Sequence, residues 1–352
     1  MFSSRFHVQE PALSPSKGSR LAKLLATLPV LWLCAGMAYP VKAQDLRVKA
    51  EAEGKLMMYA TFTAADSKTL LDGFKQVYPK IDAAYYRSND AALMERFVNE
   101  NRAGQNLCDV IVTTSFYGQN IKKRGLFTPY DSPERKFFRE GYKDPQAHWT
   151  STYTNYGAFG YNTRTVAKTS VPKSFNDLLK PEWKGQIAME GRAYEWFGTT
   201  LKAMGEEKGM AYMRELAKQT ELRTGRNLLA QLVAAGEFKG ALSGYSQTFE
   251  VLKPVGAPVD WVYLNPVFAN IHPTGIAAKA PHPNAARLFI DFVLSKRGQE
   301  VIRGMNRIPD RIDTPPDQAR LIENIKPAFA PAEVLDNFER YAKLFHEIFG
   351  GR

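Results

Sequence analysis

The sequence predicts an α/β protein of two doubly wound lobes that are joined by extended hinge crossings. Three observations support this prediction. Strand-like and helix-like segments alternate after residue 44, as they do in βαβ units with a mostly parallel sheet. Two extended stretches, 148–162 and 265–280, interrupt the alternation. The chain has 352 residues, 44% of them hydrophobic, and this length favours two lobes over one.

Residues 1–43 are predicted to be a signal peptide that takes no part in the fold. Three basic residues between 17 and 23 precede the apolar run LLATLPVLWLCAGMA, and Val41 and Ala43 occupy the small-residue positions of a cleavage site. The apolar run is too short for a spanning helix. We therefore expect cleavage near Ala43, a mature chain that begins at Gln44, and a periplasmic location.

Composition restricts the partners of the mature chain. It keeps 42 basic and 35 acidic residues, a net charge of +7 that is spread along the sequence. This mild excess predicts no nucleic-acid partner and a weak preference for anionic solutes. Cys108 is the only cysteine left, so we expect no internal disulfide and a buried thiol. No later segment is long enough to embed the mature chain in a membrane.

The first series of elements alternates between strands and helices, and Gly104 and Gly125 are expected to end two of the helices. In order, the segments are the strand KLMMYA (55–60), a helix with the core face Leu70, Phe74, Val77 and Tyr78, the helix AALMERFVNENRAG (91–104), the strand CDVIVTT (108–114) and the helix FYGQNIKKRG (116–125).

The first crossing, HWTSTYTNYGAFGYN (148–162), is rich in Thr and Tyr and lacks a helical period, so it is predicted to be extended. A second series follows: SFNDLL (174–179), GQIAME (185–190), one long helical stretch over 194–218, GRNLLAQLVAAGE (225–237), GALS (240–243) and VDWVYL (259–264). After the second crossing come two helices, whose core faces are Ala285, Leu288, Phe289, Phe292 and Val293, and Val334, Phe338, Tyr341 and Phe345. We predict that residues 44–148 and 268–310 form lobe 1, and that 149–267 and 311–352 form lobe 2.

Polar residues follow several strands, where open α/β sheets bind ligands. Thr63 and Asp66 form the pattern of a helix capping box. One interpretation is a cap without a ligand; the other is that helix-start amides, with Thr61 and Thr63, accept an anion. Thr114 and Ser115 repeat the arrangement after the next strand.

The second lobe supplies further candidates for a cleft between the lobes. Glu190, Arg192 and Trp196 follow a strand, and Arg226 precedes a helix, where a guanidinium can bind a carboxylate or phosphate in bidentate geometry. Their other interpretation is a solvated surface. Tyr245 follows the strand-like segment GALS in a turn before a helix-like segment, and it can be a metal ligand, a hydrogen-bond donor to a solute or a packed aromatic side chain.

Motifs of catalysis are missing from the sequence. It contains no H-E-x-x-H, G-x-x-x-x-G-K or G-x-S-x-G pattern, and no two histidines of the mature chain stand at metal-ligand spacing. His272 and His282 each precede a proline and are interpreted as turn residues. We predict a protein that is not an enzyme, with no catalytic residues and no resident metal or cofactor; a periplasmic enzyme on a related two-lobed fold is the alternative from another class.

Several long segments occur in a familiar order across nearly all of the mature chain. The most specific are PEWKGQI (181–187) and NAARLFIDFVLSKRGQEVI (284–302). Together they resemble the extracellular solute-binding proteins of ABC importers, in the branch that includes the periplasmic ferric-iron-binding proteins. The resemblance implies a type II periplasmic binding protein, a monomer whose two lobes close on a solute, with an ABC permease and its ATPase as partners.

The resemblance also implies where a ferric site would lie. Ferric-binding members offer a histidine in the first loop and an acidic residue after the strand that corresponds to CDVIVTT (108–114). They also offer two adjacent tyrosines in the loop that corresponds to ALSGYSQ. Here these positions read Thr63, Thr114, and Tyr245 followed by Ser246. Other branches use scattered tyrosines, and those at 117, 153, 156 and 194 are available for such a site; Tyr153, on the first crossing, is therefore kept as a candidate.

Hydroxyl groups replace anionic ligands at two of these positions, and Arg192 and Arg226 are expected at loops that face the same cleft. Such a site suits a small organic anion better than Fe³⁺. The sequence therefore predicts a periplasmic receptor for a carboxylate, a phosphonate or a phosphate ester, with the side chain of Trp196 or Tyr245 packed against the apolar part of that small-molecule ligand. Ferric iron remains the alternative ligand, because phenolate and carboxylate oxygens suit this hard cation.

Overall fold

The computed structural model describes residues 41–350, and α1 begins at Val41. The predicted signal peptide lies outside the described residues except for its last three positions. No helix within 41–350 has the length and apolar character needed to cross a membrane. The helices are α1 (Val41–Glu53), α2 (Ala64–Val77), α3 (Asp90–Arg102), α4 (Ser115–Lys123), α5 (Tyr194–Met204), α6 (Glu206–Ala217), α7 (Arg226–Ala235), α8 (Ser246–Glu250), α9 (Pro283–Leu294), α10 (Lys296–Gly304), α11 (Ala332–Asp336) and α12 (Phe338–Phe349). The strands are β1 (Lys55–Ala60), β2 (Asp82–Arg87), β3 (Val110–Val112), β4 (Phe127–Thr128), β5 (Thr150–Asn162), β6 (Ile187–Glu190), β7 (Thr220–Arg223), β8 (Gly240–Tyr245), β9 (Val259–Val262), β10 (Val267–Ala277) and β11 (Pro327–Phe329).

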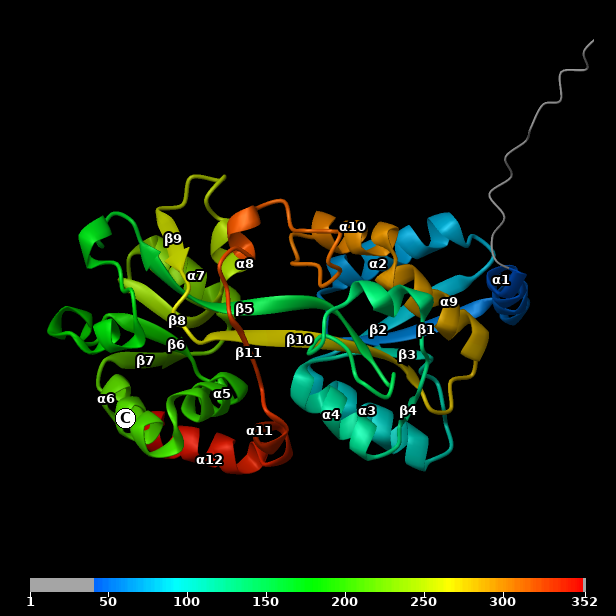
Figure 1. Cartoon of the computed structure of the whole chain (residues 1–352), viewed down its shortest axis with the longest axis horizontal. Coiled ribbons are helices and arrows are strands. Elements are labelled where there is room, and N and C mark those ends of the chain that lie inside the picture. Colours follow the sequence, from blue (N-terminus) through cyan, green and yellow to red (C-terminus); the bar gives the residue numbers. More distant parts are fainter. Residues whose placement is uncertain (1–40, 351–352) are drawn as a thin grey trace, which may run out of the picture. The chain divides into compact units, whose positions relative to one another are not determined.

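Each lobe contains three parallel strands next to one antiparallel strand. The order is β2–β1–β3–β10 in the first lobe and β7–β6–β8–β5 in the second. The strands β5 and β10 run between the lobes and pair with each other, antiparallel (Figure 1). This arrangement confirms the predicted α/β fold with two extended crossings, and it makes the crossings antiparallel to the strands that they join.

The core faces predicted from helical spacing are largely confirmed. Leu70 and Phe74 of α2 are fully buried, as are Tyr341 and Phe345 of α12. The helix predicted over 194–218 is wrong in one respect: it is two helices, α5 and α6, because Gly205 has a left-handed φ of 84° and ends the first. The predicted turn residue His272 instead lies buried within β10.

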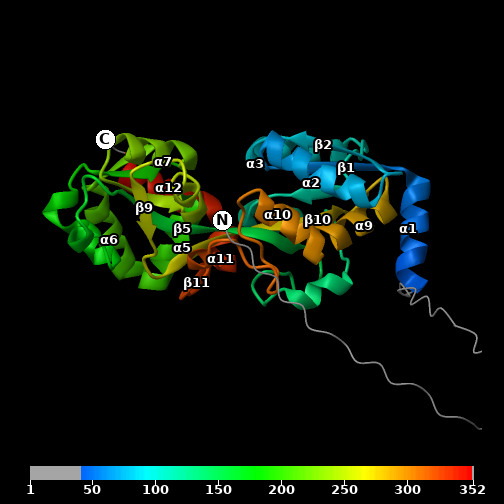
Figure 2. The same ribbon diagram turned by 90° about the horizontal axis from the view of Figure 1, so that it is seen from above.

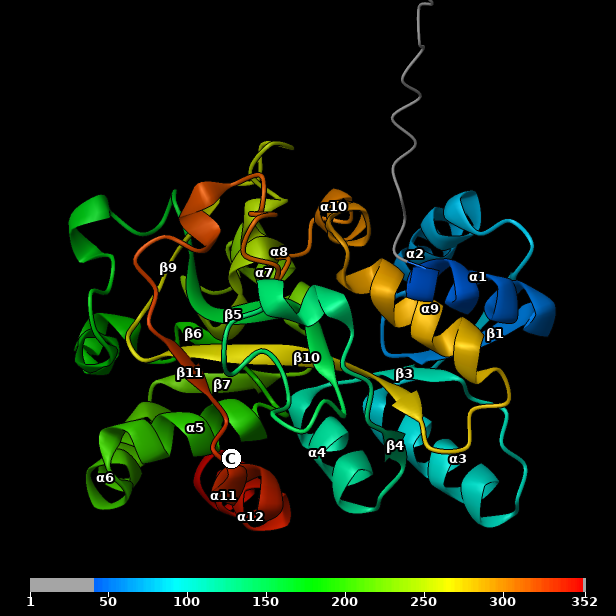
Figure 3. The ribbon, with the colours of Figure 1, turned by 45° about the vertical axis from the view of Figure 1, so that its right-hand side comes forward.

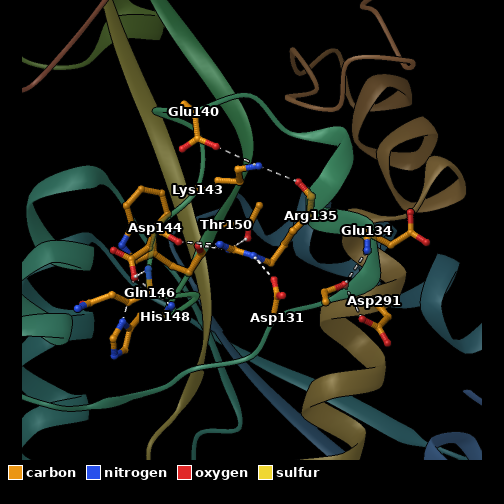
Figure 4. Close-up of polar contacts among 12 residues, drawn as sticks. Asp131, Glu134, Arg135, Glu140, Lys143, Asp144, Gln146, His148, Thr150 and Asp291 are labelled. Atoms are coloured by element: carbon orange, nitrogen blue, oxygen red, sulfur yellow. Dashed lines mark hydrogen bonds and ion pairs between the residues drawn. The ribbon is translucent and has the colours of Figure 1, made fainter. Parts of the chain in front are cut away.

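A buried arginine fixes the start of the first crossing (Figure 4). Arg135 donates to the carbonyl oxygens of Trp149 (2.9 Å) and Asp144 (2.6 Å) and to the Thr150 hydroxyl (2.6 Å). The Asp144 carboxylate pairs in turn with Lys122 of α4. Burial alone would raise the pKa of Asp144, but its hydrogen bonds lower it instead. The network therefore ties the loop before β5 to the body of the first lobe.

The last two helices lie beside the second lobe (Figure 3). They contact α5, and α11 also contacts α4 of the first lobe. At the far side of the first lobe, α1 packs along α9 (Figure 2). The predicted lobe boundaries remain a prediction, because β5 and β10 each serve both sheets.

A buried carboxyl lies against the crossings. The Thr154 hydroxyl donates to Oδ1 of Asp310 (2.6 Å), whereas Oδ2 is buried without a hydrogen-bond partner among the described residues. Burial raises the pKa of Asp310 to about 7. The folded protein therefore holds this proton at pH values where the unfolded chain, with a carboxyl pKa near its ordinary 3.8, has lost it.

Asp310→Asn is expected to change how stability depends on pH. In the unchanged protein, the stability associated with protonated Asp310 is complete below about pH 4 and is lost as the pH rises to about 7. The variant cannot ionise, so we expect it to raise the free energy of unfolding at pH 8 by roughly 1–2 kcal/mol and to change little at pH 4.5. Urea unfolding at both pH values measures this; equal effects at both would contradict it.

Candidate functional site

A cleft of about 540 Å³ lies between the two lobes. The carboxyl ends of β2, β3, β6, β7 and β8 supply most of its walls, at the edge where α/β sheets bind ligands. Its volume falls in the range of small-molecule sites and far exceeds the space that a bare ion occupies. The lining residues are Asn89, Asp90, Ala91, Thr114, Tyr117, Glu190, Arg192, Tyr194, Glu195, Thr224, Gly225, Arg226, Asn227, Tyr245, Thr248, Phe268, Asn270, Arg307 and Phe338.

Helices α3, α4, α5 and α7 begin at this cleft. Lining residues belong to the first turns or caps of α3, α4, α5 and α7. The first N–H groups of a helix have no acceptor within the helix, and the aligned peptide dipoles make this end partly positive. The electrostatic potential that the backbone contributes to the cleft therefore favours a negatively charged ligand.

Two arginines of the second lobe face the cleft without an acidic partner. Among residues 45–350, no carboxylate lies within ion-pair distance of Arg192 or Arg226. The Nε of Arg226 donates to the Ser243 carbonyl oxygen (3.2 Å), and its guanidinium lies over the ring of Tyr245, 4.4 Å from the centroid. Ser243 has a left-handed φ of 57° at an irregularity in the pairing of β8 with β5, which directs this carbonyl toward Arg226.

Two acidic residues of the cleft are already satisfied by protein groups. Glu190 accepts hydrogen bonds from the backbone N–H groups of Gly225 (2.8 Å) and Arg192 (3.2 Å). Oδ1 of Asp90 accepts from the hydroxyl groups of Thr113 (2.8 Å) and Thr114 (3.1 Å). These carboxylates hold the loops that end β7 and β3, so their charge is partly compensated before any ligand arrives.

Glu195 links the two lobes. Its Oε1 accepts the backbone N–H of Phe116 in α4 (3.1 Å), and burial raises the pKa of Glu195 to about 7. Nearby, the ring of Phe116 stacks on Phe338 of α12 with centroids 3.8 Å apart, and Lys123 pairs with Asp336 (2.5 Å). These contacts join the helix α4 to the second lobe along one side of the cleft.

Three tyrosines line the cleft, and burial raises the pKa of each. The pKa of Tyr117 rises to about 12, and those of Tyr194 and Tyr245 also lie above the ordinary value. The Tyr245 hydroxyl accepts a hydrogen bond from Nδ2 of Asn270 (2.6 Å). These phenols are therefore protonated at neutral pH. Those of Tyr117 and Tyr245 can donate hydrogen bonds to a solute, whereas the Tyr194 hydroxyl is hydrogen-bonded to Nε2 of His346 (2.9 Å).

Comparison with known proteins identifies the family. The profile of the bacterial extracellular solute-binding proteins matches residues 105–337. The chain belongs to this family. This solute-binding protein is similar to a curated relative, the "Fe(3+)-binding periplasmic protein" of Serratia marcescens. The two sequences are 24% identical over 289 residues, and the match covers 79% of this chain and 83% of the relative.

Two solved structures share the fold of the solute-binding protein. The periplasmic binding protein AfuA of Actinobacillus pleuropneumoniae, with fructose-6-phosphate bound, matches with a TM-score of 0.72 and 22% identity over 85% of this chain and 99% of that one. Iron-bound HitA of Pseudomonas aeruginosa matches with a TM-score of 0.73 and 19% identity over 84% and 99% of the two chains. These matches confirm the predicted type II periplasmic binding fold.

Half of the predicted site residues line the cleft of the solute-binding protein. They are Thr114, Glu190, Arg192, Arg226 and Tyr245. Their role in binding stays a prediction, but the fold does bring together these residues from loops that are far apart in the sequence.

The first-loop threonines do not line the cleft. Thr63 caps α2, its hydroxyl accepting the N–H of Asp66 (3.1 Å), and Asp66 pairs with Arg307 (2.6 Å). Thr61 donates its backbone N–H to the Val112 carbonyl. The structure therefore favours the capping interpretation, because the helix start that was expected to bind an anion is occupied by the chain itself.

The other three predicted residues also lie outside the cleft lining. Trp196 is buried in the core of the second lobe, because it points to the inner face of α5. Tyr153 is buried and stacked on His272, with centroids 3.8 Å apart. Ser115 is buried at the first position of α4, beneath the residues that reach the cleft. In each case packing against the lobe core overrides the exposure expected of a loop residue.

Several residues that line the cleft of the solute-binding protein were not predicted from the sequence. Asn89 and Asp90 follow β2 and begin α3, so the signal that identified the other loops, polar residues between a strand and a helix, was present there too. Phe338 was assigned to a core face, yet it is partly exposed and lines the cleft. Asn270 and Arg307 lie in and after the second crossing, where no sequence pattern distinguishes them.

Proposed function

We propose that this protein is the periplasmic component of an ABC importer. In this proposal it is exported by its signal peptide and captures a small organic anion by closure of the two lobes. It delivers the solute, chemically unchanged, to a membrane permease and its ATPase. Membership of the solute-binding family and the two-lobed fold support the receptor role. The ligand class rests on the chemistry of the cleft.

One observation carries the choice of an organic anion: the N-termini of α3, α4, α5 and α7 and two arginines that have no acidic partner within residues 45–350 face a cleft of about 540 Å³. Helix starts and arginine side chains are the groups that bind phosphate and carboxylate. The cleft residues Arg192 and Arg226 provide the fixed positive charge, and the protonated phenol of Tyr245 supplies a further donor. AfuA, whose structure contains fructose-6-phosphate, shares this fold.

Ferric iron is the second candidate, and the three cleft tyrosines favour it. Tyr117, Tyr194 and Tyr245 come from different elements yet line one cleft, as scattered phenolate ligands would. A curated relative and HitA are both described as iron-binding. Against this candidate, burial disfavours ionisation of these phenols, and the carboxylates of Asp90 and Glu190 already accept hydrogen bonds from hydroxyl and backbone groups.

A ligand screen tests the proposal. The purified mature protein is heated with phosphate esters, phosphonates, carboxylates and ferric citrate, and ligand retained from the cells is identified by native mass spectrometry. We expect an organic anion to raise the melting temperature, since a ligand at 100 times its Kd adds about 2.7 kcal/mol of stability. Incubation of the best ligand with the protein should return it unchanged.

Three outcomes would contradict the proposal. A visible tyrosinate colour on ferric loading, with no response to organic anions, would establish the second candidate instead. Conversion of the ligand into a product would establish an enzyme. Absence of any shift with all of the organic anions would remove the anion class.

A further inference from the structure

Two hydrogen-bond acceptors in the cleft are buried and unused. Within residues 45–350, neither Oε2 of Glu195 nor Oδ1 of Asn270 has a hydrogen-bond partner, although both atoms are inaccessible to solvent. Both residues line the cleft. An unpaired buried acceptor costs stability, so its presence on a residue that lines a cleft calls for an explanation.

In each of these two side chains the other polar atom already makes a hydrogen bond within the protein. Only Oε2 of Glu195 and Oδ1 of Asn270 therefore remain for a further hydrogen bond. Oε1 of Glu195 accepts the N–H of Phe116 from the opposite lobe (3.1 Å), and Nδ2 of Asn270 donates to the Tyr245 hydroxyl (2.6 Å). Glu195 stands in the first turn of α5, whereas Asn270 lies in β10. Two residues that line the same cleft, on separate elements, therefore each retain one unused acceptor.

We propose that the solute carries a hydroxyl or amino group in addition to its anionic group, and that Glu195 and Asn270 select for this donor. This inference rests on the proposed function, because it assumes that an organic anion binds between Arg192 and Arg226. A simple anion of the same charge, without a donor, leaves both acceptors unpaired. A site built to hydrogen-bond a solute group rejects an analogue that lacks it for this reason.

The electrostatic surroundings of Glu195 give the inference a second readout. The charge of Asp90 in α3 raises the pKa of Glu195, and the charge of Arg226 in α7 lowers it. The charge of Glu195 in turn raises the pKa of Tyr117 in α4 and of Tyr245 in β8. Burial is the largest effect, and it places the pKa at about 7. A donor from the solute stabilises the ionised carboxylate, so its contribution to affinity should increase as the pH rises from 6 to 8.

Matched pairs of compounds test the donor requirement by titration calorimetry at pH 6 and pH 8. The pairs are glycerol 3-phosphate with propyl phosphate, phosphoethanolamine with ethyl phosphate, and glycerate with propionate. We expect the donor-bearing member of at least one pair to bind about tenfold tighter or more. The hydroxyl pairs and the amino pair distinguish the two kinds of donor. Within the hydroxyl pairs, the ratio also cancels most of the titration of the anionic group itself.

Glu195→Gln is the matching variant, because it keeps the shape and the acceptor for the Phe116 N–H but replaces Oε2 by a donor nitrogen. We expect it to reduce the affinity ratio about tenfold and to abolish the pH dependence of that ratio. Glu207→Gln, on the exposed first turn of α6, is the control and should change neither. The melting temperatures of both variants without ligand establish that they fold.

The failures of this inference and of the proposed function are distinguishable. Equal affinity within every pair that binds, or an equal loss for both members in Glu195→Gln, overturns the donor requirement and leaves the anion receptor standing. If no member of any pair binds and the wider screen of organic anions also fails, the proposed function is wrong and the donor requirement falls with it.

Discussion

Arg226→Ala is expected to weaken binding of the solute about 30- to 100-fold, or roughly 2–3 kcal/mol. Arg226 stands at the start of α7, lines the cleft and has no acidic partner among the described residues. Its contacts with the Ser243 carbonyl and the Tyr245 ring hold the guanidinium in place before a ligand arrives. Removing it deletes a charge-assisted hydrogen bond in a partly desolvated site. Titration calorimetry with the ligand found by the screen measures the loss.

Arg223→Ala is the control for this prediction. Arg223 ends β7, three residues before Arg226, but it pairs with Glu221 and Glu237 and does not line the cleft. We expect its affinity to stay within about twofold of the original, since surface ion pairs contribute little. Unchanged affinity in Arg226→Ala, or equal losses in both variants, would show that Arg226 is not the anchor of the anion.

Gly298→Ala is expected to lower the free energy of unfolding by about 3 kcal/mol or more. Gly298 lies in the first turn of α10, directly against the end of α9. An added Cβ would lie 2.0 Å from the Phe292 carbonyl oxygen and 2.8 Å from the Cα of Val293. Both are backbone atoms, so no side-chain rotation relieves the clash and one of the two helices must move. Urea unfolding followed by circular dichroism measures the change.

Gly304→Ala, at the other end of the same helix, provides the comparison. No atom lies within 4 Å of the position that its Cβ would take, and its backbone is not left-handed. Alanine has the higher helix propensity, so we expect a neutral effect or a gain of up to about 1 kcal/mol. A loss in Gly304→Ala that matches the loss in Gly298→Ala would mean that close helix packing is not the reason that position 298 requires glycine.

The fold could be predicted because its signals are local. The strand KLMMYA and the helix that follows it are fixed by the spacing of apolar residues such as Leu70 and Phe74, which the structure buries completely. The crossings could be identified from the absence of a helical period. The prediction failed at Gly205, where a single glycine changed one long helix into two, because a periodic pattern continues across such a break.

The site was less predictable, since exposure to the cleft depends on which face of a loop or helix turns outward. Trp196 and Tyr194 are two residues apart on α5, yet the first is buried in the core and the second lines the cleft. Glu195, between them, reaches across to Phe116 of the other lobe. A helix places neighbouring residues about 100° apart, so the composition of a loop cannot tell which of them meets the ligand.

By itself, the sequence determined the α/β alternation, the two extended crossings and the family segments, because each depends on residues close together in the chain. It also indicated Arg226 and Tyr245 as cleft residues, from their place beside predicted strands and helices. Only the tertiary structure decided between the two interpretations of Thr63, in favour of the helix cap, and placed Asn270 in the lining of the cleft. The lining of the cleft depends on contacts between elements that are far apart in the sequence, and such contacts leave no local pattern.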